Sequence, residues 1–285
     1  MPVYNAGDYL VDCVNSLLGQ SYKYFELIIV DDNSKDDSFE ILKSFEKRDR
    51  RIKLFRNSKN LGVSETVKKA ISKSSGDYLA RMDADDISLP DRIEKQIEYL
   101  EKHPKTVALG GQCLLIDSNN NVIGKKTFPT SFEQIYKYIF RFIPLQQPTL
   151  VIAKKRLPDN FVFYVDGMNT AEEVELIFKL FQYGKVENLK DAVLLYRIHP
   201  NNTSLKNVKK TFFLTLLARL DGILKYHYKP TLGGVLYTIA QTLIVLILPQ
   251  KLIIGLYKFT RATSGNKSSM FKYQLLSFTP SILQK

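Results

Sequence analysis

The first 120 residues alternate between two hydrophobic patterns. Short, almost wholly apolar runs such as FELIIVDD at 25–32 are typical of strands buried on both faces of a parallel sheet. Between them, apolar residues recur at helical spacing, as at Val63, Val67 and Ile71. The predicted strands are 25–32, 52–57, 77–83 and 106–116, and the predicted helices are 7–18, 36–48, 62–74 and 89–103. This order predicts an α/β fold with a doubly wound, mostly parallel sheet covered by helices.

The start of the chain departs from that pattern. A doubly wound sheet needs an apolar strand ahead of its first helix, but MPVYN at 1–5 supplies almost none. We therefore expect either that the true start lies upstream or that the sheet lacks this strand.

From about Thr211 the pattern changes to long apolar helices. Segment 211–228 carries an apolar stripe and predicts an amphipathic helix, and segment 232–248 has 17 residues without a charge. At about 1.5 Å per residue that run covers ~26 Å, slightly less than the ~30 Å core of a bilayer. The stripe consists of Phe212, Phe213, Leu216, Leu217, Leu220, Ile223 and Leu224. Residues 206–285 are predicted to associate with a membrane, either in its plane or as one span; a buried helix or a dimer interface is the alternative.

The charge distribution supports the membrane prediction. The net charge is +12, but residues 206–285 hold 12 basic residues and one acid, Asp221, whereas the first 205 residues are nearly neutral. A basic tail rich in aliphatic residues indicates a membrane surface rather than nucleic acid as the partner. Cys13 and Cys113 form no CxxC pair, and the chain opens without a signal peptide, so we expect reduced thiols in a cytosolic protein.

Two groups of acids follow predicted strands. Asp31 and Asp32 end one strand, and MDADD at 82–86 ends another. The carboxyl ends of such strands lie at the ligand-binding edge of the sheet. Carboxylates at that edge suit Mg²⁺, which binds through one or two protein carboxylates and a substrate's phosphates. Helix capping by Asp86 or Ser88, and by the first pair of acids, is the structural alternative.

A third pair of acids, Glu172 and Glu173, begins a helix predicted over 169–184. Acids in a first turn are favoured by the helix dipole, which is a sufficient structural reason for their presence. A carboxylate at the mouth of the same site is also the expected type of general base.

These segments together resemble a known family. PVYNAGDYL, FELIIVDDNSKD, NLGVSETVKKAI, GDYLARMDADDISLPDRIEKQIEYL and AEEVELIFKLFQYGKV…LLYRIH occur in this order over about 1–205. The set closely resembles the family 2 glycosyltransferases of GT-A fold, and within them bacterial enzymes that build cell-surface polysaccharides. The resemblance implies a glycosyltransferase domain over 1–205, with the opening strand truncated, followed by the tail at 206–285.

The resemblance implies a role for each matching position. The first loop would line the nucleotide pocket, Asp32 would bind the base, the next loop would approach the ribose and diphosphate, and a Tyr-Arg-x-His segment would close on the diphosphate. Asp83 and Asp85 would form the Asp-x-Asp motif, with Asp85 the direct metal ligand. Glu173, where the family usually has Asp, would be the catalytic base, with Glu172 as its alternative. The implied nucleotide-sugar residues are Pro2, Tyr4, Asn5, Asp32, Asn60, Gly62, Asp83 and Arg197, and the implied metal ligands are Asp85, Asp83 and His199.

The implied reaction is transfer with inversion from a nucleotide-diphosphate sugar held with Mg²⁺ or Mn²⁺. The membrane tail favours a lipid-linked glycan as acceptor, at the cytoplasmic face of the plasma membrane. Three alternatives stay open: transfer to a polyprenyl phosphate, which needs no hydroxyl base; a nucleotidyltransferase, for which PVYNAGDYL lacks the Gly-rich phosphate loop; and a non-catalytic scaffold docked on the membrane.

Overall fold

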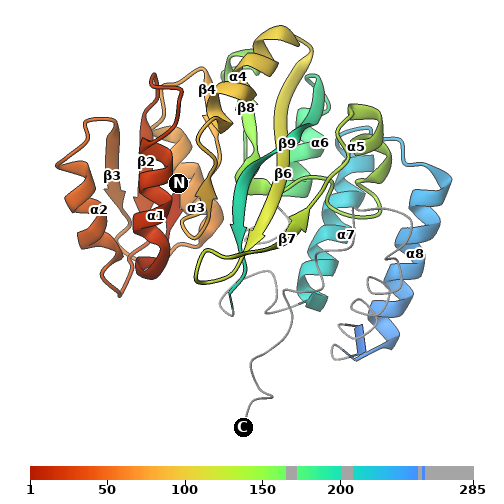
Figure 1. The fold of residues 1–285 in the computed structure, drawn as a ribbon. Helices are drawn as coiled ribbons and strands as arrows, with labels where there is room; N and C mark the ends of the chain where they lie inside the picture. The colour runs from red at the N-terminus through yellow and green to blue at the C-terminus, as the bar shows by residue number, and fades with distance from the viewer. Residues whose placement is uncertain (165–171, 200–207, 250–251, 254–285) are drawn as a thin grey trace.

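The protein folds around two sheets that lie side by side (Figure 1). The structure is a computed structural model and describes residues 1–164, 172–199, 208–249 and 252–253. The first sheet has the order β1-β2-β3, formed by Pro2–Val3, Leu27–Asp31 and Ile52–Arg56, and both of its pairings are parallel. Every residue of β2 is buried, as its continuous apolar run predicted.

Three helices accompany the first sheet: α1 (Gly7–Leu18), α2 (Ser38–Glu46) and α3 (Val63–Ser72). Their buried residues lie three or four positions apart, which is the spacing of one helix face. In α1 these residues are Leu10, Cys13, Val14 and Leu17. The crossover connections of the first half therefore follow the predicted order of strands and helices.

The second sheet is mixed, so the predicted mostly parallel sheet is wrong for this half of the protein. Its order is β4-β8-β6-β9-β5, with β7 paired to β6, and only β6 and β9 run parallel. The strands are β4 (Tyr78–Ala80), β5 (Ile87–Ser88), β6 (Thr106–Ile116), β7 (Val122–Lys126), β8 (Val151–Ala153) and β9 (Lys185–Arg197). A short turn after β6 returns the chain as β7, and a tight turn produces an antiparallel pair rather than a parallel one.

Three further helices pack against this sheet: α4 (Arg92–Lys102), α5 (Phe132–Tyr138) and α6 (Glu172–Leu180). Two short 3₁₀ turns, η1 (Gln147–Thr149) and η2 (Lys154–Arg156), flank β8. The sequence pattern did not predict β5, β7, β8, β9 or α5. The 13 residues of β9 do not alternate regularly between buried and exposed positions, and the other four elements are short. Strands of two to five residues and a seven-residue helix are too short for a clear period.

The opening strand exists but is two residues long. Pro2 and Val3 pair in register with Val30 and Asp31 of β2. β1 and β4 are the facing edges of separate sheets, and a cavity of about 460 Å³ lies between them. Its lining includes Ile28, Leu79 and Arg81.

The last described helices are α7 (Val208–Leu224) and α8 (Leu232–Ile247), at the end of the molecule opposite α1 and α2 (Figure 1). The sequence pattern predicted these two helices, but within the described residues no helix is long and apolar enough to cross a membrane. The predicted domain boundary at 205–206 and the tail beyond 253 lie outside the described residues.

Candidate active site

The candidate site forms where the chain passes from β4 to β5. β5 pairs with the end of β9, with Ile87 opposite Leu195. This pairing brings His199 beside Asp85, although 114 positions separate them in the chain. Topology therefore joins the Asp-x-Asp segment to the Tyr-Arg-x-His segment.

Asp85 and His199 form the central contact. Asp85 Oδ2 lies 2.9 Å from His199 Nε2, and the two side chains are 29% and 10% exposed. The ring of Tyr9 on α1 lies 5.0 Å from the imidazole and packs beside it. The carboxylate and the imidazole thus contact each other directly, and both side chains remain partly exposed.

Arg197 holds the backbone of the loop that carries Asp85. Its side chain is almost completely buried, and its Nε and Nη1 donate to the carbonyl oxygens of Asp85 and Asp117 at 2.7 and 3.0 Å. Its backbone N–H donates to Asp86 Oδ1 at 2.9 Å. Burial, with the charge of Asp85 adding to it, raises the pKa of Asp86 well above its ordinary value. In this structure Arg197 therefore positions the loop that presents Asp85.

Asp83 is held by an arginine that the sequence analysis did not single out. Arg81 Nη2 lies 2.7 Å from Asp83 Oδ1, and Arg81 Nη1 donates to the carbonyl of Met82. The buried Arg92 on α4 in turn donates to the carbonyl of Arg81 at 2.8 Å. Burial, together with the charge of Asp85, raises the pKa of Asp83 against the opposing charge of Arg81.

Glu172 and Glu173 begin α6 near the same arginine. Burial raises the pKa of both carboxyls, and the charge of Glu172 helps to raise the pKa of Glu173 to about 7. The charge of Asp83 also raises the pKa of both glutamates, whereas the charge of Arg81 lowers it. Glu172 Oε2 is buried and has no hydrogen-bond partner among the described residues. A carboxyl group with a pKa near 7 can accept a proton at neutral pH.

Asp32 belongs to a second group of residues, at the end of β2. Its Oδ1 accepts hydrogen bonds from Asn57 Nδ2 at 2.8 Å and from the N–H of Leu61 at 2.9 Å, and its Oδ2 accepts one from the N–H of Gly62 at 2.9 Å. Gly62 has φ 87°, a conformation that suits glycine, and Asn60 beside it is exposed. Asp32 thus shapes the loop ahead of α3, and its contact with a base stays a prediction.

The first loop meets this second group. Asn5 has φ 49°; its N–H donates to Ser34 Oγ at 3.0 Å, and its Oδ1 accepts from the N–H of Lys35 at 2.8 Å. Tyr4 beside it is 49% exposed, and Pro2 lies in β1. The predicted nucleotide-binding residues are therefore divided among β1 and the loop after it, the end of β2, the loop ahead of α3, the β4–β5 loop and the end of β9.

The residues present fit a divalent cation bound together with its substrate. Within the described ranges, no group of three or more His, Cys, Asp or Glu side chains is arranged to hold a metal ion. Asp85 Oδ2 and His199 Nε2 nevertheless lie 2.9 Å apart, and Oδ1 of Asp83 pairs with Arg81. Mg²⁺ and Mn²⁺ are commonly bound by one or two protein groups, with phosphates and water completing the shell.

Arg81 and Arg92 are the residues of the site that sequence reasoning missed. Arg81 stands inside ARMDADD, the segment quoted for its acids, and Arg92 follows the proline of LPDR. The detectable signal was an arginine on the buried face of α4, beside Ile93 and Gln96. Buried arginines are rare unless they are paired, so such a position indicates a polar partner.

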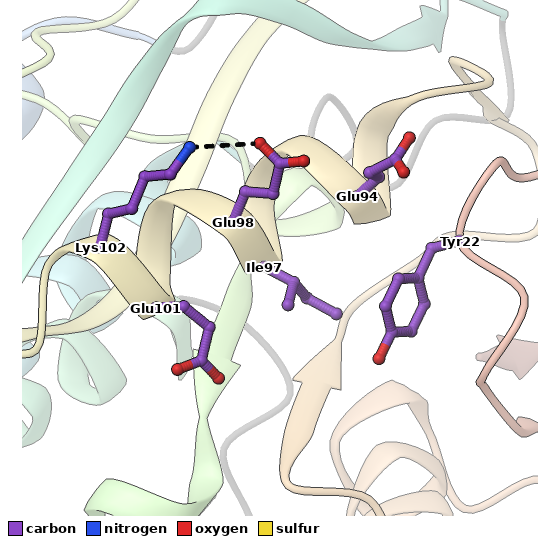
Figure 2. A pocket seen from close by; sticks show the side chains of 6 residues that line it. All are labelled: Tyr22, Glu94, Ile97, Glu98, Glu101 and Lys102. Carbon is purple, nitrogen blue, oxygen red and sulfur yellow. Dashed lines mark ion pairs between the residues drawn. The ribbon is translucent and has the colours of Figure 1, made fainter.

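A separate hollow lies on the outer face of α4 (Figure 2). It has a volume of about 450 Å³ and is lined by Tyr22, Glu94, Ile97, Glu98, Glu101 and Lys102. Glu98 and Lys102 pair at 3.5 Å, and both are well exposed. None of the predicted site residues lines this hollow.

The family model described as Glycosyl transferase family 2 matches residues 1–157. An uncharacterized glycosyltransferase of Haemophilus influenzae is 29% identical over 70% of this chain, which spans 65% of that relative's length. Two Bacillus subtilis proteins with provisional names are also similar. The glycosyltransferase EpsE is 28% identical over 96% of both chains, and the teichuronic acid biosynthesis glycosyltransferase TuaG is 39% identical over 40% of this chain and 45% of its own.

Solved structures share the fold. S. aureus TarS 1-349 in complex with UDP-GlcNAc superposes with a TM-score of 0.60, covering 77% of this chain and 65% of that chain at 18% identity. The mannosyltransferase PcManGT of Pyrobaculum calidifontis, in complex with GDP-Man and Mn²⁺, superposes with a TM-score of 0.56. It covers 97% of this chain and 83% of its own at 13% identity.

Proposed function

Because this chain belongs to glycosyl transferase family 2, we propose that it moves a sugar from a nucleotide-diphosphate sugar to a hydroxyl group of a glycan acceptor in the synthesis of a bacterial surface polysaccharide. The observation that carries the proposal is the contact between Asp85 and His199, next to Asp83, whose charge helps to raise the pKa of Glu173 to about 7. These contacts support a site in which Asp85 and His199 would bind a cation and Glu173 would accept a proton.

The donor half of the site consists of Asp85, His199 and the loop supported by Arg197. Asp85 and His199 would hold Mg²⁺ or Mn²⁺, as the complex of PcManGT with GDP-Man and Mn²⁺ suggests. The cation supplies charge neutralisation for the diphosphate leaving group. Arg81 pairs with Asp83 and holds it near the cation site. The loop ahead of α3, whose Gly62 N–H donates to Asp32, supports the nucleoside.

The acceptor half depends on Glu173. In its ionised form it removes the proton of the acceptor hydroxyl as the oxygen attacks the anomeric carbon. The bond from that carbon to the diphosphate breaks, and attack from the opposite face inverts the configuration. A single displacement needs one base, which explains why the second glutamate, Glu172, can stay buried beside Arg81.

The proposed acceptor is a glycan linked to a lipid at the cytoplasmic face of the plasma membrane. Its support is the basic, aliphatic composition of residues 206–285. Transfer to a polyprenyl phosphate would use the same donor residues but would not need Glu173 as a base.

A donor-turnover assay tests the function. The full chain is incubated with a panel of nucleotide-diphosphate sugars, with and without Mn²⁺, and released nucleoside diphosphate is measured. We expect metal-dependent release from one donor and its loss in Asp85→Asn. The control is Asp91→Asn, at the residue before α4, whose side chain is 47% exposed and pairs with Lys95, and it should keep full activity. Release that survives Asp85→Asn unchanged would contradict the proposal.

A further inference from the structure

The helix α7 buries its small and polar residues and exposes its large apolar residues. The residues it buries against the body are small or polar: Thr215, Ala218, Arg219 and Gly222. The residues it exposes are large and apolar: Phe213, Leu217, Leu220 and Leu224, the last with 74% of its surface accessible. The sequence analysis predicted that this stripe associates with a membrane and kept a buried helix as the alternative, and the exposure of these leucines argues against the buried alternative.

The same inversion recurs in α8. This helix buries Gly234, Thr238 and Val245. Its opposite face is a continuous aliphatic stripe, with exposed fractions of 51% to 76%. The stripe consists of Leu232, Leu236, Ile239, Leu243, Leu246 and Ile247. At 100° per residue these six positions fall on one side of the helix, and the three buried positions fall on the other.

Specific contacts fix both helices in this orientation. Gly222 of α7 lies directly against the ring of the buried Phe178, where a Cβ would come within 2.9 Å. Thr238 Oγ1 of α8 donates to the carbonyl of Phe140 at 2.7 Å. Arg219 joins the two helices, because its Nη1 donates to Gln241 Oε1 at 3.3 Å. The apolar stripes therefore face away from the body and cannot turn inward without breaking these contacts.

Composition distinguishes between possible occupants of these stripes. Protein interfaces are enriched in Tyr, Trp, Met and Arg and depleted in Lys. Here the exposed face is mostly Leu and Ile, and the nearby charges are lysines with a single acid, Asp221. Lys210, Lys225 and Lys229 are exposed at the ends of α7 and ahead of α8. Aliphatic side chains bordered by lysines match a membrane surface that contains anionic lipid.

We propose that α7 and α8 lie in the plane of an anionic bilayer surface, with their Leu/Ile stripes at the acyl boundary and their lysines at the headgroups. Both helices are shorter than a span: α8 has 16 residues, or about 24 Å at the helical rise, against a core of ~30 Å. An in-plane position is the arrangement that buries the stripes. It does not depend on the transferase chemistry, so vesicle binding and donor turnover can fail separately.

Vesicle flotation of the full chain tests the proposal. We expect binding to vesicles of phosphatidylcholine with about one third phosphatidylglycerol, weaker binding to pure phosphatidylcholine, and partial loss at high salt. The affinity of the double variant Leu236→Ser/Leu243→Ser for these vesicles should fall by about tenfold or more. The matched control is Val11→Ser/Val122→Ser, two exposed valines on α1 and β7, and it should bind as the parent chain does.

Three results would overturn the proposal. The first is a full chain that stays in solution with anionic vesicles. The second is equal loss of binding in the control variant. The third is a dimer in sedimentation velocity that the Leu236→Ser/Leu243→Ser variant dissociates, because a second copy would then cover the stripes.

Discussion

The β4–β5 loop and the α7–α8 pair break the usual division of polar and apolar residues in opposite directions. The loop buries charge: Asp86 is 1% exposed, and Arg92 of α4, which donates to the carbonyl of Arg81, is 0% exposed. The helices expose hydrocarbon, with Leu224 and Leu232 among the most accessible apolar residues described. Both departures cost free energy in the isolated protein. Each departure matches the partner proposed for its region, a cation with its substrate for the loop and lipid for the helices.

Glu173→Gln should give the largest difference between the two regions, because it should reduce sugar transfer and leave vesicle binding unchanged. Loss of a general base costs about 10² to 10⁴ in rate, so we expect sugar transfer to fall by that factor. Vesicle binding should not change, since Glu173 lies on α6, outside the exposed stripes. The measurement is kcat for transfer, paired with flotation. Retained transfer would instead favour a phosphate acceptor, which needs no base.

The pH dependence of kcat/KM should test the role of Glu173 as the base. Burial and Glu172 raise the pKa of Glu173 to about 7, and only its ionised form accepts a proton. We therefore expect kcat/KM to rise about tenfold per pH unit below that value and to level off above it. In Glu173→Asp the profile should keep its shape with a shifted midpoint. A profile that is flat between about pH 5.5 and 8 would argue against Glu173 as the base.

A pair of glycines tests whether α7 is held in its inverted orientation by close packing. Gly222→Ala should destabilise the protein by about 1–3 kcal/mol, because its Cβ would press on the buried ring of Phe178. Gly233→Ala in α8 would meet only the side-chain end of Arg141, so it should be neutral or stabilising by up to about 1 kcal/mol. Urea denaturation measures both. Equal effects would mean that the orientation does not depend on this contact.

The smallest expected effect is on the stability of the free protein when the stripe is altered. Leu243→Ser removes a side chain that is 53% exposed, so the unfolding free energy should change by no more than about 0.5 kcal/mol. The same substitution in the core, Leu109→Ser, removes a side chain that is 0% exposed and should cost about 3 kcal/mol or more. A large loss in Leu243→Ser would show that another part of the chain covers the stripe.

The sequence predicted well the elements with a long, clear period. The bounds predicted for the helix at 7–18 and the strand at 106–116 match α1 and β6. Periodicity could not reveal that β8 runs antiparallel to β6, because direction depends on the connection rather than on the strand's residues. Nor could it show that the apolar stripe of α7 is exposed, since a period locates a face without saying what covers it.

The site was predictable in part. Three aspartates within MDADD indicated a cation on charge grounds alone. The contact between Asp85 and His199 spans 114 positions, so only the family resemblance could suggest it. Arg81 escaped notice because a basic residue beside acids is common on surfaces, and only the folded chain shows that its side chain is 10% exposed.

Arg197 ties the Asp85 loop to the end of β9, and from there the chain leads to α7. Nine peptide steps separate His199 from Val208, the first residue of α7. Even a fully extended chain covers about 32 Å in nine steps. The chain therefore limits the distance between His199 and the start of α7. With α7 at the bilayer, the site of sugar transfer would lie within a limited distance of the lipid surface. Acceptor glycans would then be selected by how far they stand from the membrane as well as by their chemistry.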